Sequence, residues 1–88
     1  MIVRIDKSFQ KDLNKINDQK IKDSVVEIIR NIQLAQQLSA INNLKKLAGH
    51  KNKYRVRIGD YRIGIAYSEN TLFFIRFLNR KEIYQKWP

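Results

Sequence analysis

The chain has 88 residues, of which 43% are hydrophobic, and it carries a formal net charge of +10. This length fits one domain, 1–88, because two domains would each be too small to bury an adequate core, and the hydrophobic content excludes a wholly disordered chain. Because there is no cysteine and one histidine, disulfides, thiol chemistry and Cys-based or multi-His metal sites are excluded, and we expect no metal and no cofactor.

The basic residues are concentrated in the second half of the chain. Residues 1–44 hold seven basic and five acidic residues, a net charge of +2, whereas residues 45–88 hold eleven and three, a net charge of +8. No acidic residue lies between Glu27 and Asp60. This asymmetry indicates a polyanionic partner, either nucleic acid or a very acidic protein. Solubility is the ordinary alternative, although a charge of roughly 2–8 already serves that purpose in a small domain.

No part of the sequence predicts a membrane or export segment. The apolar stretches are all shorter than the roughly 18 residues that a membrane span needs. The short apolar run at the N-terminus is followed at once by Asp6 and further charges, unlike a signal peptide. We therefore expect a soluble, cytoplasmic protein with no membrane partner.

The first half of the chain predicts a strand followed by two helices. Residues 2–6 are short and rich in β-formers, which is typical of a strand. Ser8 is a candidate cap for a first helix, and Asp18 for a second. The apolar faces of these helices are formed by Phe9, Leu13 and Ile16 and by Ile21, Val25, Ile28 and Ile32, with Leu34, Ala35 and Leu38 as an extension of the second.

Two amphipathic helices joined by a tight turn form a helical hairpin that needs another layer to cover its apolar faces. The polar side chains of this hairpin are of mixed sign. We expect them to form a solvated surface; they include Lys11, Asp12, Lys15, Lys20, Lys22, Asp23 and Glu27.

The second half of the chain predicts a connector, three strands and a terminal helix. Residues 39–53 form the connector, after which 54–58 and 61–67 alternate strictly between apolar and other residues on either side of a two-residue turn, Gly59–Asp60. Residues 68–70 form another turn, 71–78 a further strand, and 80–87 one or two helical turns. The predicted fold class is α+β, β-α-α-β-β-β with a short C-terminal helix, in which an antiparallel twisted sheet packs against the helical hairpin.

The two-residue turn predicts the register of the central hairpin. Arg57 lies opposite Arg62, and Arg55 opposite Gly64, on the face away from the apolar side chains. Directly opposed like charges destabilise a sheet by up to roughly 1 kcal/mol. A bound anion resolves this conflict, because arginine presents a planar fork of donors that suits phosphate. The alternative is that these arginines simply extend into solvent from an exposed sheet face.

Small residues beside the arginines predict a groove for a ligand. Gly64 and Ala66 share the face of the arginines, so a bulky group can settle there. Arg80 and Tyr84 are four residues apart on the terminal helix, where Tyr84 can donate a proton or stack on a base. The alternative is that Tyr84 and Trp87 cover the end of the sheet.

Three other polar residues have ordinary interpretations. His50 lies in the connector and is expected to be a surface residue. Asp60 is expected to be a turn residue, and Glu82 to form an ion pair within the last helix, near Arg80.

Three segments carry a recognisable pattern: residues 47–49 read Leu-Ala-Gly, residues 54–62 read Tyr-Arg-Val-Arg-Ile-Gly-Asp-Tyr-Arg, and residues 77–84 read Phe-Leu-Asn-Arg-Lys-Glu-Ile-Tyr. Together they resemble the RelE/ParE superfamily of toxins from bacterial type II toxin–antitoxin systems. The resemblance rests on the order and spacing of these segments in a short basic chain. The predicted first strand and helical hairpin fit the layout of this family, so the resemblance covers essentially the whole chain.

The resemblance implies a toxin that a cognate antitoxin protein neutralises. RelE-like members cut messenger RNA, commonly on the ribosome, whereas ParE-like members inhibit DNA gyrase without catalysis. Carried over, the catalytic positions are Arg55, Arg57, Arg62, Arg80 and Tyr84. In the basic half of the chain we also expect RNA-binding residues, at Lys45, Lys46, Lys51, Lys53 and Lys81. Asn79 stands where many relatives have a histidine, so the resemblance favours Tyr84 over a histidine as the proton-transfer group. With the composition and charge, our first expectation is a metal-independent endoribonuclease, the second a gyrase inhibitor and the third a general nucleic-acid-binding domain.

Overall fold

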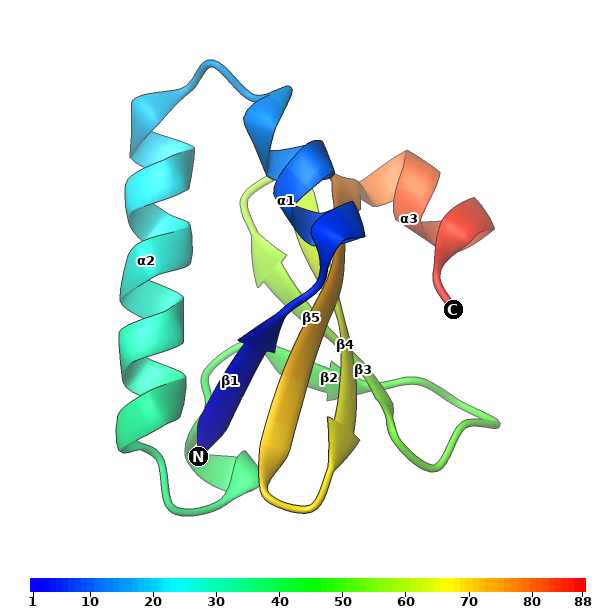
Figure 1. The fold of residues 1–88 in the computed structure, drawn as a ribbon. Helices are drawn as coiled ribbons and strands as arrows, with labels where there is room; N and C mark the ends of the chain where they lie inside the picture. Colours follow the sequence, from blue (N-terminus) through cyan, green and yellow to red (C-terminus); the bar gives the residue numbers. More distant parts are fainter.

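A computed structural model describes residues 1–88 and confirms the predicted α+β architecture (Figure 1). The secondary structure elements run in the order β1 (Ile2–Ile5), α1 (Lys7–Asn14), α2 (Gln19–Leu34), η1 (Leu38–Ala40), β2 (Leu44–Lys46), β3 (Lys53–Ile58), β4 (Tyr61–Ser68), β5 (Thr71–Asn79) and α3 (Arg80–Lys86). None of the three α-helices is long and apolar enough to cross a membrane.

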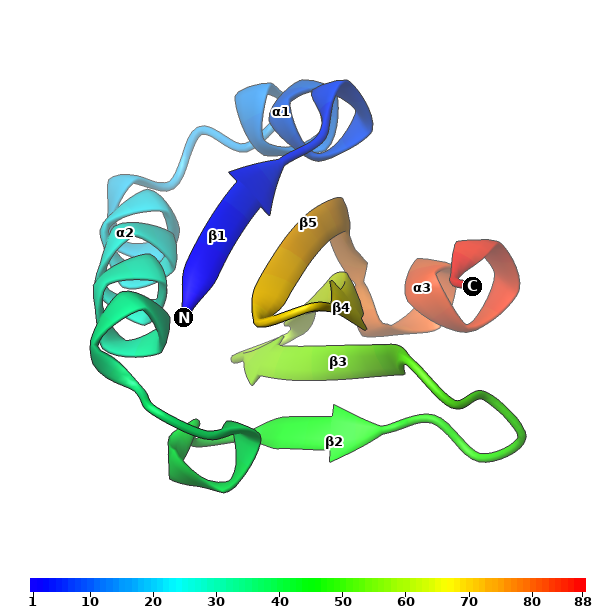
Figure 2. The same cartoon turned by 60° about the horizontal axis from the view of Figure 1, so that its bottom comes forward.

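The sheet is mixed, with strand order β1-β5-β4-β3-β2 (Figure 2). The expectation of an antiparallel sheet holds for β2 to β5 but is wrong for β1, which pairs with β5 in parallel. In the sequence, α1 and α2 separate β1 from the other strands. In the sheet, β1 is an edge strand and lies beside β5, on the side away from β4. The predicted connector also contains the short strand β2, which extends the sheet beyond β3.

The central hairpin has the register that its turn predicts. Arg57 pairs with Arg62, Val56 with Ile63, and Arg55 with Gly64. Gly59 in the turn has a φ of 54°, a left-handed conformation that glycine adopts without steric cost. The apolar residues of the two strands therefore face the helical layer, and the arginines face the opposite side.

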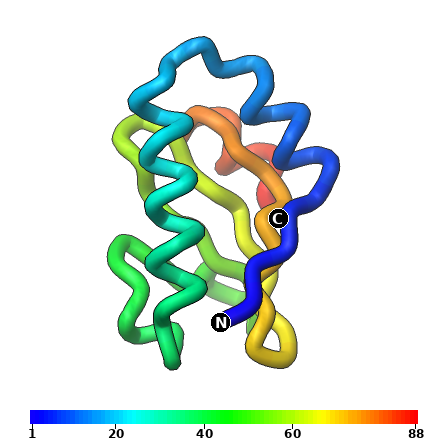
Figure 3. The backbone as a smooth tube through the Cα atoms, turned by 60° about the vertical axis from the view of Figure 1, so that its left-hand side comes forward, coloured from blue at the N-terminus to red at the C-terminus, as the bar shows by residue number.

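The sheet separates two apolar clusters. The larger one lies between the sheet and the helices α1 and α2, and its fully buried members are Phe9, Val25, Ile32, Val56, Ile63, Ile65, Leu72, Phe74 and Phe77. The smaller one consists of Leu47, Leu78, Ile83 and Trp87, and α3 supplies its cover. Figure 2 shows α2 and α3 on opposite sides of the sheet, and Figure 3 shows α2 in front of the strands. Both faces of the central strands are therefore covered in part by helices.

The ends of the helices differ in part from the predicted ends. Asp18 caps α2 as predicted, with its side chain accepting a hydrogen bond from the Lys20 amide at 2.9 Å. Ser8 is not a cap, because α1 already begins at Lys7. The helix α2 ends at Leu34, so the predicted extension through Leu38 is wrong; Ala35 has extended backbone angles.

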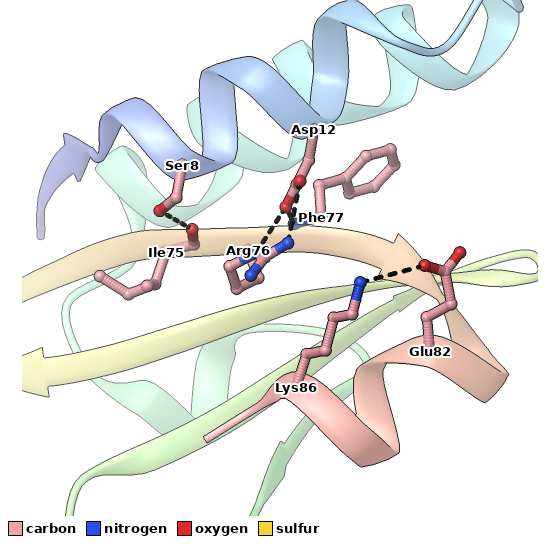
Figure 4. Close-up of polar contacts among 7 residues, drawn as sticks. All are labelled: Ser8, Asp12, Ile75, Arg76, Phe77, Glu82 and Lys86. Atoms are coloured by element: carbon pink, nitrogen blue, oxygen red, sulfur yellow. Dashed lines mark hydrogen bonds and ion pairs between the residues drawn. The ribbon is translucent and has the colours of Figure 1, made fainter.

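Polar side chains of α1 complete the outer edge of β5 beyond the end of β1 (Figure 4). The Ser8 hydroxyl donates a hydrogen bond to the carbonyl oxygen of Ile75, and the Phe77 amide donates one to Asp12 at 2.9 Å. Asp12 also accepts hydrogen bonds from Arg76 at 2.8 and 3.1 Å. The expectation of a solvated Asp12 is therefore wrong: its side chain is 5% exposed. The hydrogen bond to Asp12 raises the pKa of Arg76 above its usual value.

Candidate nucleic-acid site

A basic pocket lies at the junction of β2, β3, β4 and α3. Its volume is about 500 Å³, and no acidic residue lines it. The lining residues are Asn43, Leu44, Lys45, Lys46, Leu47, Ala48, Arg55, Arg57, Arg62 and Tyr84. A cavity of similar size, about 520 Å³, lies between α2 and η1, but it is lined by Glu27 and by no basic side chain. Of these two cavities, only the basic pocket has the charge that a polyanion requires.

The register of three strands positions the basic side chains of this pocket. Lys45 lies opposite Arg55 on β2 and β3, and Arg57 lies opposite Arg62 on β3 and β4. Alternate residues of a strand point to the same face, so Arg55 and Arg57 share a face. The pairing of the strands therefore fixes the backbone positions from which these basic side chains extend into the pocket.

Arg57 and Arg62 carry positive charge that no acidic side chain neutralises. The two ion pairs of the structure, Arg76 with Asp12 and Lys86 with Glu82, lie elsewhere. The Arg57 side chain is exposed. Arg62 donates hydrogen bonds from Nη1 to the carbonyl oxygens of Gly59 at 2.8 Å and Tyr61 at 2.9 Å. These bonds fix the guanidinium beside the turn without reducing its charge.

Arg55 is held by the C-terminal segment. Its Nη2 donates a hydrogen bond to the carbonyl oxygen of Trp87 at 2.8 Å, and its guanidinium carbon lies 4.6 Å from the centroid of the Tyr84 ring. The Nε atom of Arg55 is buried and has no hydrogen-bond partner. Much of the donor fork of Arg55 is therefore turned toward the protein, in contrast to that of Arg57.

The expectation of a ligand groove at Gly64 and Ala66 is wrong, because Trp87 fills that space. A Cβ atom at Gly64 would lie 2.7 Å from the Trp87 ring, and Ala66 packs against the same apolar cluster. The Trp87 indole donates a hydrogen bond from Nε1 to the carbonyl oxygen of Tyr54 at 3.1 Å. The alternative interpretation of Trp87 as a cover of the sheet is the one that the structure supports. Tyr84 behaves differently, since the residue is 67% exposed and lines the pocket.

The other predicted site residues lie outside the basic pocket. Arg80 is exposed at the start of α3, where its amide donates a hydrogen bond to the carbonyl oxygen of Asp60 at 2.8 Å. Lys51 lies with His50 in an adjoining cavity of about 370 Å³. The Nζ atom of Lys53 lies 5.5 Å from the centroid of the Trp87 ring, and Lys81 lines a separate cavity between α1 and α3.

The ion pair predicted for Glu82 exists within α3, but its partner is Lys86 at 3.7 Å and not Arg80. The structure also contains no group of three or more His, Cys, Asp or Glu side chains that could hold a metal ion. The chemistry available in the pocket is therefore that of fixed positive charge, a phenol and amines.

The sequence matches a known protein family and a curated relative over nearly its whole length. A family model described as the ParE toxin of the type II toxin–antitoxin system parDE matches residues 3–84. Toxin RelE3 of Methanocaldococcus jannaschii is 38% identical over 89 residues, which covers 100% of both chains.

Solved structures of similar fold include toxins in complex with antitoxins. A chain of the RelB–RelE antitoxin–toxin complex from Methanococcus jannaschii is 36% identical, with a TM-score of 0.81 over 97% of this chain and 99% of that one. A chain of the RelBE2 toxin–antitoxin complex from Mycobacterium tuberculosis is 23% identical, with a TM-score of 0.69 over 90% of each chain, and supports the fold alone.

Proposed function

Because the chain belongs to the RelE/ParE superfamily of toxins of type II toxin–antitoxin systems and is RelE-like, we propose that it cuts messenger RNA on the ribosome and so inhibits translation. One observation carries this proposal: the acid-free pocket in which Arg57 and Arg62 lie directly opposite each other, with Tyr84 exposed beside them. Such a pocket suits a phosphodiester whose charge increases during the reaction.

The proposed reaction is attack of an RNA 2′-hydroxyl on the adjacent phosphorus. A bond forms between the 2′-oxygen and phosphorus, the bond to the 5′-oxygen breaks, and the products are a 2′,3′-cyclic phosphate and a 5′-hydroxyl. The 2′-hydroxyl loses a proton, and the leaving 5′-oxygen gains one. The extra negative charge on the pentacoordinate phosphorus is offset by Arg57 and Arg62, which are fixed donors suited to phosphate oxygens.

The proton transfers require groups other than arginine. Arginine has a pKa above about 12 and does not serve as a general base near neutral pH. Tyr84, Lys45 and Lys46 are the groups in the pocket that can transfer a proton. Holding the RNA with its 2′-oxygen in line with the leaving group supplies a further part of the rate. Without a His–Glu pair, we expect slow cleavage of free RNA.

The remaining predicted basic residues extend the proposed RNA surface beyond the pocket. Lys51 adjoins it through the shared residues Lys46, Leu47 and Ala48. Lys53, Arg80 and Lys81 lie farther along the chain's basic half, and we assign to them contacts with flanking phosphates. They affect affinity more than the rate of the chemical step.

A cognate antitoxin is the proposed protein partner. The similar chain from Methanococcus jannaschii was solved as an antitoxin–toxin complex. A partner segment that bears acidic residues complements a half-chain of net charge +8.

Primer extension on cellular messenger RNA after brief induction tests the proposed function. We expect discrete new 5′ ends within codons in cells that express the wild-type chain, and none with the Arg57→Ala/Arg62→Ala double variant. Purified protein with an RNA oligonucleotide tests metal independence, because cleavage there is expected to persist in EDTA. A strict Mg²⁺ requirement with the oligonucleotide would contradict the metal-free mechanism.

The second candidate is a gyrase inhibitor without catalysis, since the matching family model is named for ParE. The same induction experiment separates the two candidates. Loss of plasmid supercoiling with intact messenger RNA identifies gyrase as the target and removes the proposed nuclease.

A further inference from the structure

The Trp87 indole packs against the central hairpin, on the face that carries the arginines. We call the space that it fills the Trp87 seat. The seat consists of Gly64, whose missing side chain leaves room for the indole, and the Tyr54 carbonyl, which accepts its Nε1 proton. Leu47, Leu78 and Ile83 surround the ring, so that only 7% of Trp87 is exposed. Any side chain at position 64 would have to displace the indole, because the ring atoms lie 2.7–2.9 Å from the position of a Cβ atom.

The packing of Trp87 in this seat fixes two pocket residues, Arg55 on β3 and Tyr84 on α3. The Trp87 carbonyl oxygen accepts the hydrogen bond from Arg55, and the Arg55 guanidinium in turn lies over the Tyr84 ring. The helix α3 has seven residues, too few to be stable alone. Its contacts with the sheet are made by the buried side chain of Ile83 and by Trp87, which also donates its amide proton to the Ile83 carbonyl oxygen at 2.8 Å.

We propose that Trp87 is the positioning residue of the basic pocket: the indole in the Trp87 seat holds α3 so that Tyr84 enters the pocket, and its carbonyl oxygen orients Arg55. This inference rests on the proposed RNA cleavage, in which Tyr84 transfers a proton and Arg57 and Arg62 bind the phosphate. Arg55 then serves to connect Trp87 with Tyr84 and is not the main phosphate ligand. Trp87 itself touches neither RNA nor the reacting atoms.

A double-mutant cycle between Gly64 and Trp87 tests the seat. Gly64→Ala places a methyl group in the space that the indole occupies, and position 64 does not itself line the pocket. We expect it to lower kcat for cleavage of an RNA oligonucleotide by roughly 10- to 100-fold, because displacement of a catalytic group by about 1 Å costs that much. The KM is expected to change little, since Arg57, Arg62, Lys45 and Lys46 remain. In a Trp87→Ala background, Gly64→Ala is expected to have no further effect.

The conservative variant and a matched control separate positioning from general damage. Trp87→Phe keeps a ring in the seat and is expected to retain most of kcat, although it loses the bond to the Tyr54 carbonyl. Ser68→Ala lies on the same strand as Gly64, at its exposed end, and is expected to leave kcat and KM unchanged. Additive losses from Gly64→Ala and Trp87→Ala, or a loss confined to KM, would overturn the proposal. If Trp87→Ala does not fold, Gly64→Ala and Trp87→Phe still decide it.

Fluorescence gives a second readout that does not depend on cleavage, because Trp87 is the sole tryptophan of the chain. We expect short-wavelength emission shielded from acrylamide in the wild type, and red-shifted, accessible emission in Gly64→Ala. A red shift with unchanged kcat would overturn the positioning role, and an unchanged spectrum would remove the seat itself. If wild-type protein cuts no RNA, the proposed nuclease fails, and the emission of Gly64→Ala alone decides whether the seat exists.

Discussion

Arg57 and Arg62 differ in how the protein holds them, although they lie opposite each other. The turn carbonyls of Gly59 and Tyr61 hold the Arg62 guanidinium, whereas Arg57 is exposed and its side chain has no hydrogen bond to the protein. Their mutual repulsion works against the pairing of β3 with β4. A fold under selection for stability alone would place Thr or Glu at one of these positions, so the pair accords with the proposed phosphate site.

Replacement of either arginine by alanine is expected to remove toxicity and RNA cleavage while the protein stays folded. Arg57→Ala relieves the repulsion and loses no bond, so its free energy of unfolding should rise by up to about 1 kcal/mol. Arg62→Ala relieves the same repulsion but also loses two hydrogen bonds, so little net change is expected. Urea unfolding measures the stability, and growth after induction at matched expression measures the toxicity. Arg30→Ala, an exposed arginine on α2, is the control and should remain toxic; full toxicity of both pocket variants would reject the site.

The helix α1 protects an edge of the sheet with its side chains. The strand β1 covers β5 only as far as Phe74, and unpaired strand edges favour aggregation. The Asp6 amide bonds to the Phe74 carbonyl oxygen, and beyond that point the Ser8 hydroxyl and the Asp12 carboxylate bond to the backbone of β5. The first turns of α1 therefore continue the pairing that β1 begins.

Asp12→Ala is expected to lower the free energy of unfolding by about 3 kcal/mol. The variant leaves the buried Phe77 amide and the Arg76 guanidinium without their acceptor. The loss of one partner of a buried ion pair typically costs about 3–5 kcal/mol. The cost here is at the lower end because Arg76 is partly exposed and water can solvate its guanidinium. Chemical denaturation measures the change. Lys11→Ala, at the exposed neighbouring position, should change stability by less than about 0.5 kcal/mol. A loss for Asp12→Ala no larger than that of the control would contradict the assigned role of α1.

Local patterns predict the central hairpin but not the contacts between distant segments. The Gly59–Asp60 turn is sufficient to give the register of β3 and β4, because a two-residue loop leaves one pairing. The burial of Asp12 depends on Arg76 and Phe77, and the filling of the Gly64 space depends on Trp87. These partners are far apart in the chain and no periodicity connects them. A glycine beside an alanine in a strand does signal that a large group packs there, but it does not say whether that group is a ligand or the chain itself.

The molecule as a whole has its positive charge on the half that forms β2 to β5 and α3. Residues 1–44, which form β1 and the helical hairpin, have a net charge of +2, and residues 45–88 a net charge of +8. An acidic partner is therefore attracted to one side of the molecule before contact. Such long-range attraction acts on the rate of association, whereas apolar contacts and hydrogen bonds govern the rate of dissociation.

The association rate with the co-encoded antitoxin is expected to fall as salt increases, while the dissociation rate changes little. Screening shortens the range of the field from about 30 Å at 0.01 M salt to about 8 Å at 0.15 M. Stopped-flow or surface binding measurements over this range give both rates. A Lys45→Gln/Lys46→Gln variant should show a shallower salt dependence of association, and Lys20→Gln/Lys22→Gln, on α2, should match the wild type. A salt-insensitive association rate would remove the basic face from antitoxin binding.

The parallel pairing of β1 with β5 affects the order in which a nascent chain can fold. The strand β1 pairs only with β5, which is synthesised after all the other strands. Its pairing therefore cannot form until residues 71–74 have emerged from the ribosome. At about 5–20 residues per second this wait is on the order of several seconds. The pocket waits longer still, because Trp87 and Tyr84 emerge after β5. The basic pocket of a newly translated chain is therefore incomplete until almost all of residues 1–88 have left the exit tunnel.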